Sequence, residues 1–180
     1  MSRSIARWTC LVVMWSAAAV LARQTPGVPA PVSTDARPLS AEDEMKTFVM
    51  PPGYHVELVA SEPLVHDPIL VDFDPDGRMW VIEMSGYMND ITASNEHEGL
   101  CRIVVLEDTD GDGRMDKRTV FADGLVLPRA LKVLDRGVLV GEPPNLWLMK
   151  DTNGDLEADT KTLVTDLYGK RDANVEHNAN

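Results

Sequence analysis

Alternating acidic residues in one short segment give this chain its clearest chemical signature. Asp108, Asp110 and Asp112 are followed by Gly113 and then by Asp116, the spacing found in the first half of an EF-hand loop. Calcium takes roughly six to eight oxygen ligands, and carboxylates at alternate positions of a tight turn converge on one point. Carboxylates packed this closely repel one another without a cation. The segment therefore predicts a calcium site.

Three neighbouring features define how this loop would bind an ion. The main-chain carbonyl of Arg114 would be a ligand, and Asp116 would bind directly or through water. Thr119 stands where an EF-hand places its bidentate Glu, so the affinity should be modest unless another segment contributes. The flanks are β-branched and apolar, which predicts a calcium loop between two strands. The alternative is a solvated acidic turn without an ion.

The same pattern recurs later in the chain in a weaker form. Asp151, Asn153, Asp155 and Asp159 repeat the spacing of the first loop. Asn153 lowers the charge, and Leu156 replaces the glycine that the turn prefers. The sequence leaves open whether this second loop binds an ion.

A third match to the spacing begins at Asp72 and ends at Gly77. Its fourth acidic position is occupied by Trp80, and Pro75 suits an ordinary turn. We expect a plain hairpin there.

The elements that would position these loops are short strands. A short helix is expected at 41–48, capped by Ser40 and ended by Pro51-Pro52, and after it the apolar period changes to two. Gly, Pro and Asp punctuate the remainder. The predicted strands are 54–60, 69–73, 79–83, 102–107, 118–121, 130–134, 138–141, 146–150 and 162–164.

The two Asp-rich loops belong to a longer internal repeat. Residues 106–112 are echoed by 149–155 at an offset of 43 residues, and the similarity continues to Asp123 and Asp166. A period of roughly 40–50 residues with four short strands is the size of one propeller blade. One blade is expected at 69–121, with an insertion at 84–99, and the next at 130–164.

This arrangement predicts an all-β fold, an incomplete β-propeller of about two blades. Residues 54–60 would be the outer strand that closes the ring with a last blade. Two blades do not close a ring and leave sheet edges exposed, so we expect the chain to be a fragment of a larger protein.

The N-terminus predicts export. Arg3 and Arg7 precede an apolar run at 8–21, and Ala22 ends a cleavage-type motif, which together are typical of a signal peptide at 1–22. The run is short for a bilayer span of roughly 20 residues, and a Pro-rich linker follows at 23–38. We expect a periplasmic or cell-surface protein. An uncleaved anchor, with membrane association, is the alternative.

Charge and cysteine content exclude several classes of function. The chain has 29 acidic and 17 basic residues, a formal net charge of −12, which makes it a poor candidate for nucleic-acid binding. Cys10 lies in the signal, so the mature chain keeps only Cys101 and has no intrachain disulfide. No C-x-x-C-H haem-attachment motif occurs in the 180 residues.

Five stretches taken together resemble a known family. They are LVDFDPDGRMWVIEM (70–84), the run 106–124, LPRAL (127–131), GEPPNLW (141–147) and EHNAN (176–180). These residues are similar to the PVC-type (planctomycete) membrane-bound dehydrogenase family, and the resemblance covers nearly all of 39–180. It implies that 39–180 is the N-terminal part of a six-bladed propeller similar to the soluble quinoprotein glucose and sorbosone dehydrogenases. Many members continue into helical repeats and a C-terminal cytochrome c domain.

The resemblance also implies residue roles. His177 matches a channel-facing His that takes the proton as hydride passes from the sugar to PQQ, and a neutral imidazole is a suitable base for an alcohol. Asn180 departs from the His-x-Gly-Gly pattern of those enzymes. Arg129, Asn178 and Asn180 are the implied cofactor contacts, although an ion pair is an equal alternative for Arg129. Haem c is implied only for a C-terminal region outside this sequence.

Three hypotheses of function follow from these observations. The first is a quinoprotein-like sugar or alcohol dehydrogenase domain that passes electrons to missing C-terminal domains of the same protein. The second is a non-catalytic, calcium-stabilised propeller that binds carbohydrate or a protein partner. The third, a dockerin-like tandem, predicts helices after each loop and a repeat nearer about 24 residues, and the 43-residue offset counts against it.

Overall fold

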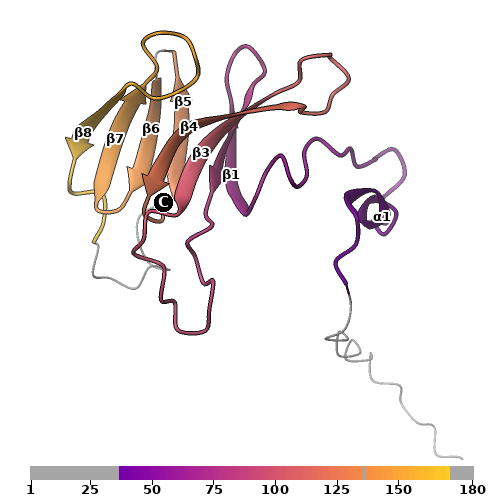
Figure 1. Ribbon diagram of the computed structural model, residues 1–180. Helices are drawn as coiled ribbons and strands as arrows, with labels where there is room; N and C mark the ends of the chain where they lie inside the picture. The colour runs from indigo at the N-terminus through magenta and orange to yellow at the C-terminus, as the bar shows by residue number, and fades with distance from the viewer. Residues whose placement is uncertain (1–36, 136, 171–180) are drawn as a thin grey trace, which may run out of the picture. The chain divides into compact units, whose positions relative to one another are not determined.

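The computed structural model describes residues 37–135 and 137–170 (Figure 1). The chain divides into two units, Met1–Pro38 and Leu39–Asn180, and all the regular structure described below belongs to the second. The predicted signal peptide and nearly all of the predicted linker lie outside the described residues. In the described part of the chain, no helix is both long and apolar enough to cross a membrane.

Eight strands form two four-stranded antiparallel sheets, and in each sheet every strand pairs with the next one along the chain (Figure 1). The first sheet consists of β1 (Pro68–Phe73), β2 (Met79–Glu83), β3 (Cys101–Glu107) and β4 (Lys117–Leu125). The second consists of β5 (Ala130–Leu134), β6 (Gly137–Glu142), β7 (Asn145–Lys150) and β8 (Thr160–Thr165). The fold is all-β, and two unclosed sheets of this kind are consistent with an incomplete propeller, as predicted.

The helix α1 (Ala41–Met45) begins where predicted and ends earlier. The Ser40 hydroxyl accepts a hydrogen bond from the Asp43 N–H at 3.1 Å, so Ser40 is the N-cap. Acidic residues fill the first turn, which suits the helix dipole. None of the helical residues is buried, so tertiary packing does not extend the helix toward Phe48.

Residues 54–60 depart from the prediction. They are not part of either ladder, because no described strand lies beside them to supply hydrogen-bond partners. Within the described residues, the backbone hydrogen bond of this segment to the sheet region runs from the Met115 N–H to the Val59 carbonyl, at 2.8 Å. The other predicted strands are confirmed, with ends that differ by a few residues.

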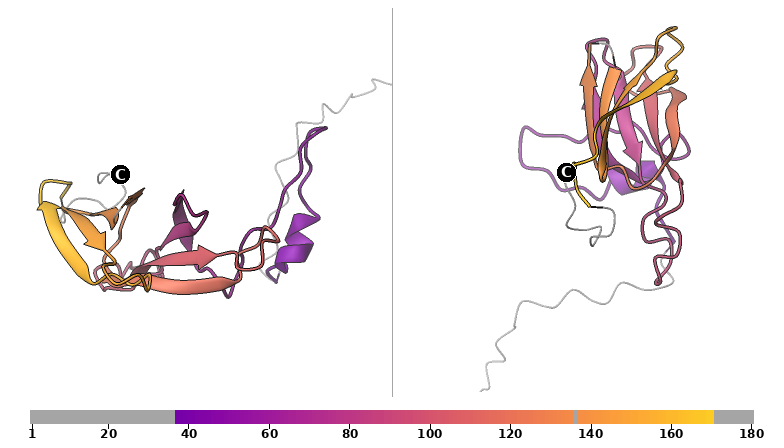
Figure 2. Two further views of the ribbon diagram at one scale, coloured as in Figure 1. Left: turned by 90° about the horizontal axis from the view of Figure 1, so that it is seen from above. Right: turned by 90° about the vertical axis from the view of Figure 1, so that its left-hand side faces the viewer.

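The main core lies between the two sheets. Trp80 and Phe121 from the first sheet meet edge to face, with ring centroids 4.8 Å apart. Val138, Val140 and Met149 of the second sheet belong to the same buried cluster. Figure 2 shows the two sheets from above and from the side.

The strands β1 and β5 are joined at this interface by one carboxylate. Asp72 accepts hydrogen bonds from the Val133 N–H and from Lys132 Nζ, both at 2.8 Å. These bonds lower the pKa of Asp72 although burial works to raise it. These bonds connect β1 of the first sheet to β5 of the second.

A buried glutamate ends the second strand of the first sheet. Glu83 is 1% exposed. One carboxylate oxygen accepts the His66 N–H at 3.0 Å, and the other accepts Arg118 Nη2 at 2.9 Å. The carboxylate thus ties the segment before β1 to the outer strand β4.

The second sheet repeats this device. Glu142 ends β6, accepts the Val126 N–H at 2.7 Å before β5, and accepts Lys161 Nζ at 3.2 Å from the outer strand β8. The Trp147 indole N–H donates to it as well, at 2.8 Å. Arg118 and Lys161 are separated by the repeat offset of 43 residues. The contact of a buried glutamate with a preceding N–H and a basic residue of the outer strand, here called the glutamate clamp, therefore belongs to the repeat.

Candidate metal centre

The first Asp-rich loop connects β3 to β4, so it lies between two strands as predicted from its β-branched and apolar flanks. The Asp116 N–H donates to the Glu107 carbonyl at 2.9 Å and closes the base of the loop. Gly111 and Gly113 have φ values of +77° and +90°, a region in which only glycine is unstrained. The sequence therefore places glycine at two positions where the chain turns left-handed.

Three carboxylates of this loop converge. Asp108, Asp110 and Asp116 each offer one oxygen, and these oxygens all lie within 4.8 Å of one another. Hard cations such as calcium take oxygen ligands at about 2.3–2.6 Å, so oxygens at opposite sides of one ion lie roughly 5 Å apart. This is the one cluster of three such side chains found in the described part of the chain.

One of the predicted carboxylate ligands lies outside this cluster. Asp112 is not part of it, and its Oδ1 accepts the Arg114 N–H at 2.8 Å. That bond stabilises the turn locally. The main-chain carbonyl of Arg114 stays a predicted ligand.

Hydrogen bonds hold the converging carboxylates in place. Asp108 accepts the Gly113 N–H at 2.9 Å and the Gly111 N–H at 2.7 Å, and these donors lower its pKa. Asp116 accepts from the Thr109 hydroxyl at 2.8 Å. A carboxylate offers about four lone-pair sites, so each group retains acceptor capacity for an ion. The loop's own donors thus hold the carboxylates of Asp108 and Asp116 in place.

The second loop has the same hydrogen-bonded frame but a different centre. Asp151 accepts the Gly154 N–H at 2.6 Å and the Leu156 N–H at 2.8 Å, which match the bonds of Asp108. Burial works against ionisation of Asp151, but these backbone donors lower its pKa overall. Asn153 Nδ2 donates to Asp159 at 3.2 Å, so an amide satisfies the carboxylate internally.

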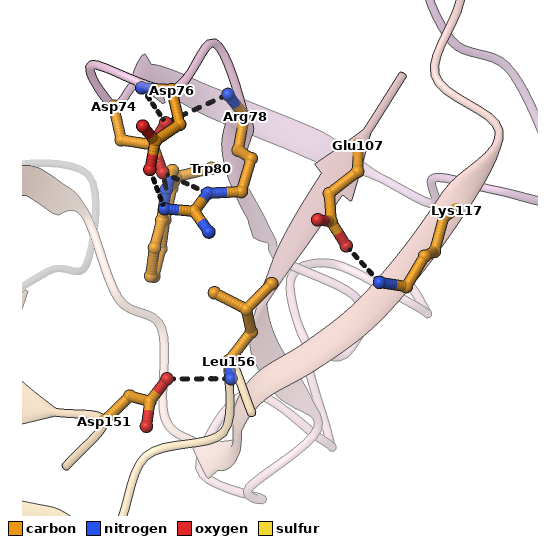
Figure 3. A network of polar contacts seen from close by, with 8 residues as sticks. All are labelled: Asp74, Asp76, Arg78, Trp80, Glu107, Lys117, Asp151 and Leu156. Atoms are coloured by element: carbon orange, nitrogen blue, oxygen red, sulfur yellow. Dashed lines mark hydrogen bonds and ion pairs between the residues drawn. The ribbon is translucent and has the colours of Figure 1, made fainter. Parts of the chain in front are cut away.

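Leu156 shows what the second loop does instead. It has a φ of +64° at the place of Gly113, a strained conformation for a leucine. Its half-buried side chain packs against the core between the sheets. In Figure 3 it points from the loop of Asp151 toward the first-sheet network around Arg78. The second loop therefore anchors one sheet to the other.

The third match is a hairpin, as expected. The buried Asp74 carboxylate accepts the Arg78 N–H at 3.0 Å, Arg78 Nε at 2.6 Å and Trp80 Nε1 at 3.0 Å (Figure 3). Burial raises the pKa of Asp74, but the Trp80 and Arg78 donors outweigh it and lower the pKa. Gly77, at φ +84°, completes the turn.

The residues implied by the family resemblance are only partly within reach. His177, Asn178 and Asn180 lie outside the described residues. Arg129 directly precedes β5 and is half-buried, and its N–H donates to the Gly141 carbonyl at 2.7 Å. No ion pair of the Arg129 side chain occurs among residues 37–135 and 137–170.

Sequence reasoning missed the two buried glutamates. Glu83 and Glu142 follow apolar runs and resemble solvent-facing strand ends. The signal that could have revealed them is their shared position at the end of the second strand in each repeat. A basic residue, Arg118 or Lys161, follows on the fourth strand of the same repeat.

In the described part of the chain, the fold is all-β, with two propeller-type sheets and one cluster of converging carboxylates. The family model described as "Domain of unknown function (DUF7133)" matches residues 40–180, so the chain belongs to that family. No curated protein matches the chain.

Proposed function

We propose that this chain is a calcium-stabilised, propeller-type domain of an exported, quinoprotein-like dehydrogenase that acts on a sugar or an alcohol. The observation that carries the calcium part is the convergence of Asp108, Asp110 and Asp116 between two paired strands. The dehydrogenase part is supported by the family resemblance of the sequence.

The ion would have a structural role. The loop joins β3 to β4, and its base is closed by the bond between Asp116 and Glu107. The preceding residue, Met115, donates its N–H to the Val59 carbonyl and so connects the loop to the segment before the first sheet. Binding an ion to Asp116 would therefore hold three parts of the chain together, because an ion that binds only the folded loop stabilises the fold.

For the enzymatic role, this chain would supply binding and proton transfer. PQQ, when bound, would accept the hydride from the substrate. The Arg129 guanidinium, directly before β5, would contact the anionic cofactor, and Asn178 and Asn180 would assist. His177 would take the proton from the substrate hydroxyl. Electrons would pass to haem c in further domains of the same protein.

Thermal unfolding in calcium and in chelator tests the structural part. Asp110→Ala should lower the melting temperature in calcium buffer and leave it unchanged in chelator. Asp112→Ala is the matched control, since Asp112 lies outside the cluster, and it should change both values equally. Equal shifts for Asp110→Ala in both buffers would remove the calcium proposal.

Dye reduction tests the enzymatic part. The full-length protein with added PQQ should reduce an artificial electron acceptor when given a sugar or an alcohol, and Arg129→Ala should raise the PQQ concentration required. Calcium-dependent stability without PQQ binding or dye reduction would favour the non-catalytic propeller that binds carbohydrate or a protein partner.

A further inference from the structure

The face of the first sheet that points away from the second sheet is incompletely covered. On β1, Ile69, Val71 and Phe73 alternate outward and are 49%, 45% and 54% exposed. An apolar groove of about 440 Å³ lies beside them, lined in part by Val71, Val81 and Leu58. Exposed apolar rows of this kind in soluble proteins mark contact surfaces.

The corresponding face of the second sheet indicates which structure covers a face of this kind. Val71 pairs with Val81 in the first sheet, and Leu131 pairs with Val140 in the second, at corresponding places. Leu131 is only 7% exposed because the first sheet packs on it. A neighbouring sheet is thus the structure that buries this position.

The segment 54–60 occupies the place of one strand of such a sheet. The Met115 N–H donates to the Val59 carbonyl at 2.8 Å, and the Ala158 N–H donates to the Phe121 carbonyl at the same distance. Met115 and Ala158 are 43 residues apart, which is the repeat offset. Residues 54–60 therefore stand to the first sheet as β4 stands to the second.

The connection that follows this segment repeats as well. Asp67 and Leu127, just before β1 and β5, both have left-handed backbone, with φ of +44° and +47°. The preceding residues, His66 and Val126, both donate their N–H to a buried glutamate. The correspondence thus extends over the whole path from the outer strand into the next sheet.

We propose that this surface docks a three-stranded antiparallel β-sheet supplied by further residues of the same polypeptide. Its outer strand pairs with residues 56–60, as β3 pairs with β4, and its apolar face covers Val71 and Phe73. A second copy of this chain fits less well, because its second sheet already has a fourth strand, β8, in the place that 54–60 fills. This docking requires neither a bound ion nor catalysis.

Two substitutions at corresponding positions test the proposal. Val71→Asp and Leu131→Asp are made both in the 180-residue chain and in the polypeptide of the complete reading frame. In the 180-residue chain, only Leu131→Asp should lower the melting temperature strongly. In the complete polypeptide, Val71→Asp should lower it by as much as Leu131→Asp does. A harmless Val71→Asp in the complete polypeptide would overturn the proposal.

Hydrogen exchange provides a second readout that does not depend on a variant. The amides of residues 56–60 should exchange at least about tenfold more slowly in the complete polypeptide than in the 180-residue chain. Equal exchange in the two would contradict strand pairing. A complete reading frame without further strand-forming residues would contradict the proposal that the same polypeptide supplies the docked sheet. Dimers of the 180-residue chain that Val71→Asp abolishes would assign the surface to a second copy instead.

Discussion

Removal of the Glu83 carboxylate is the sharpest perturbation of the fold. Glu83→Ala deletes the acceptor of the His66 N–H and of Arg118 Nη2, at 3.0 and 2.9 Å. A hydrogen bond to a charged group contributes about 1.5–3 kcal/mol, and an orphaned buried donor costs about 1–3 kcal/mol. The Arg118 Nε already lacks a hydrogen-bond partner, so Glu83 supplies the pairing of that guanidinium. We expect the free energy of unfolding to fall by about 3–5 kcal/mol.

Urea unfolding with paired variants measures this effect. Glu83→Gln retains an acceptor for the His66 N–H but loses the charge and the oxygen that accepts from Arg118 Nη2. Its loss should be smaller than that of Glu83→Ala, about 1–2 kcal/mol. Glu62→Gln is the exposed control, and it should stay within about 0.5 kcal/mol of the parent. The midpoint should shift with an unchanged slope. A loss below about 1 kcal/mol for Glu83→Ala would refute a stabilising role of the glutamate clamp at Glu83.

Other predictions concern pH and the backbone. The pKa of Asp74 is lowered in the folded state, so its contribution to stability is present above the unfolded pKa of about 3.9 and is lost as the pH falls from there through the folded pKa. Asp74→Asn should therefore lower the melting temperature at pH 7, and the difference should vanish in strong acid; a constant difference would contradict this. Gly113→Ala should cost about 1–2 kcal/mol from its φ of +90° alone, since no atom lies within 4 Å of the added Cβ. An unchanged urea midpoint for that variant would refute the strain. Leu156→Gly should lose more in packing than it gains in relieved strain, so a stabilised variant would contradict its anchoring role.

The local pattern of the sequence determines much of this fold. Apolar alternation and Gly, Pro and Asp turns place the strands, because a half-buried strand requires period two and a tight turn requires residues that tolerate its φ. The same pattern of strands and turns occurs twice at an offset of 43 residues, which indicates two similar sheets. The segment 54–60 also alternates, but alternation describes only its faces and says nothing about whether a partner strand is present.

The candidate site was predictable in part. The spacing of Asp108, Asp110 and Asp116 is local, so their convergence follows from the loop itself. The different role of Leu156 depends on the core between the sheets, a long-range contact that spacing does not encode. The buried position of Glu142 likewise depends on Val126 and Lys161, which are remote in sequence.

Direct calcium titration of the purified chain by calorimetry tests the central claim most directly. One ion should bind per chain, Asp110→Asn should abolish the binding heat, and Asp112→Asn should largely retain it. Asn153→Asp replaces the amide that donates to Asp159 with a carboxylate, so this variant should bind calcium more tightly in the second loop. An absence of binding heat in the parent chain, or equal loss in Asp110→Asn and Asp112→Asn, would contradict a calcium centre at Asp108, Asp110 and Asp116.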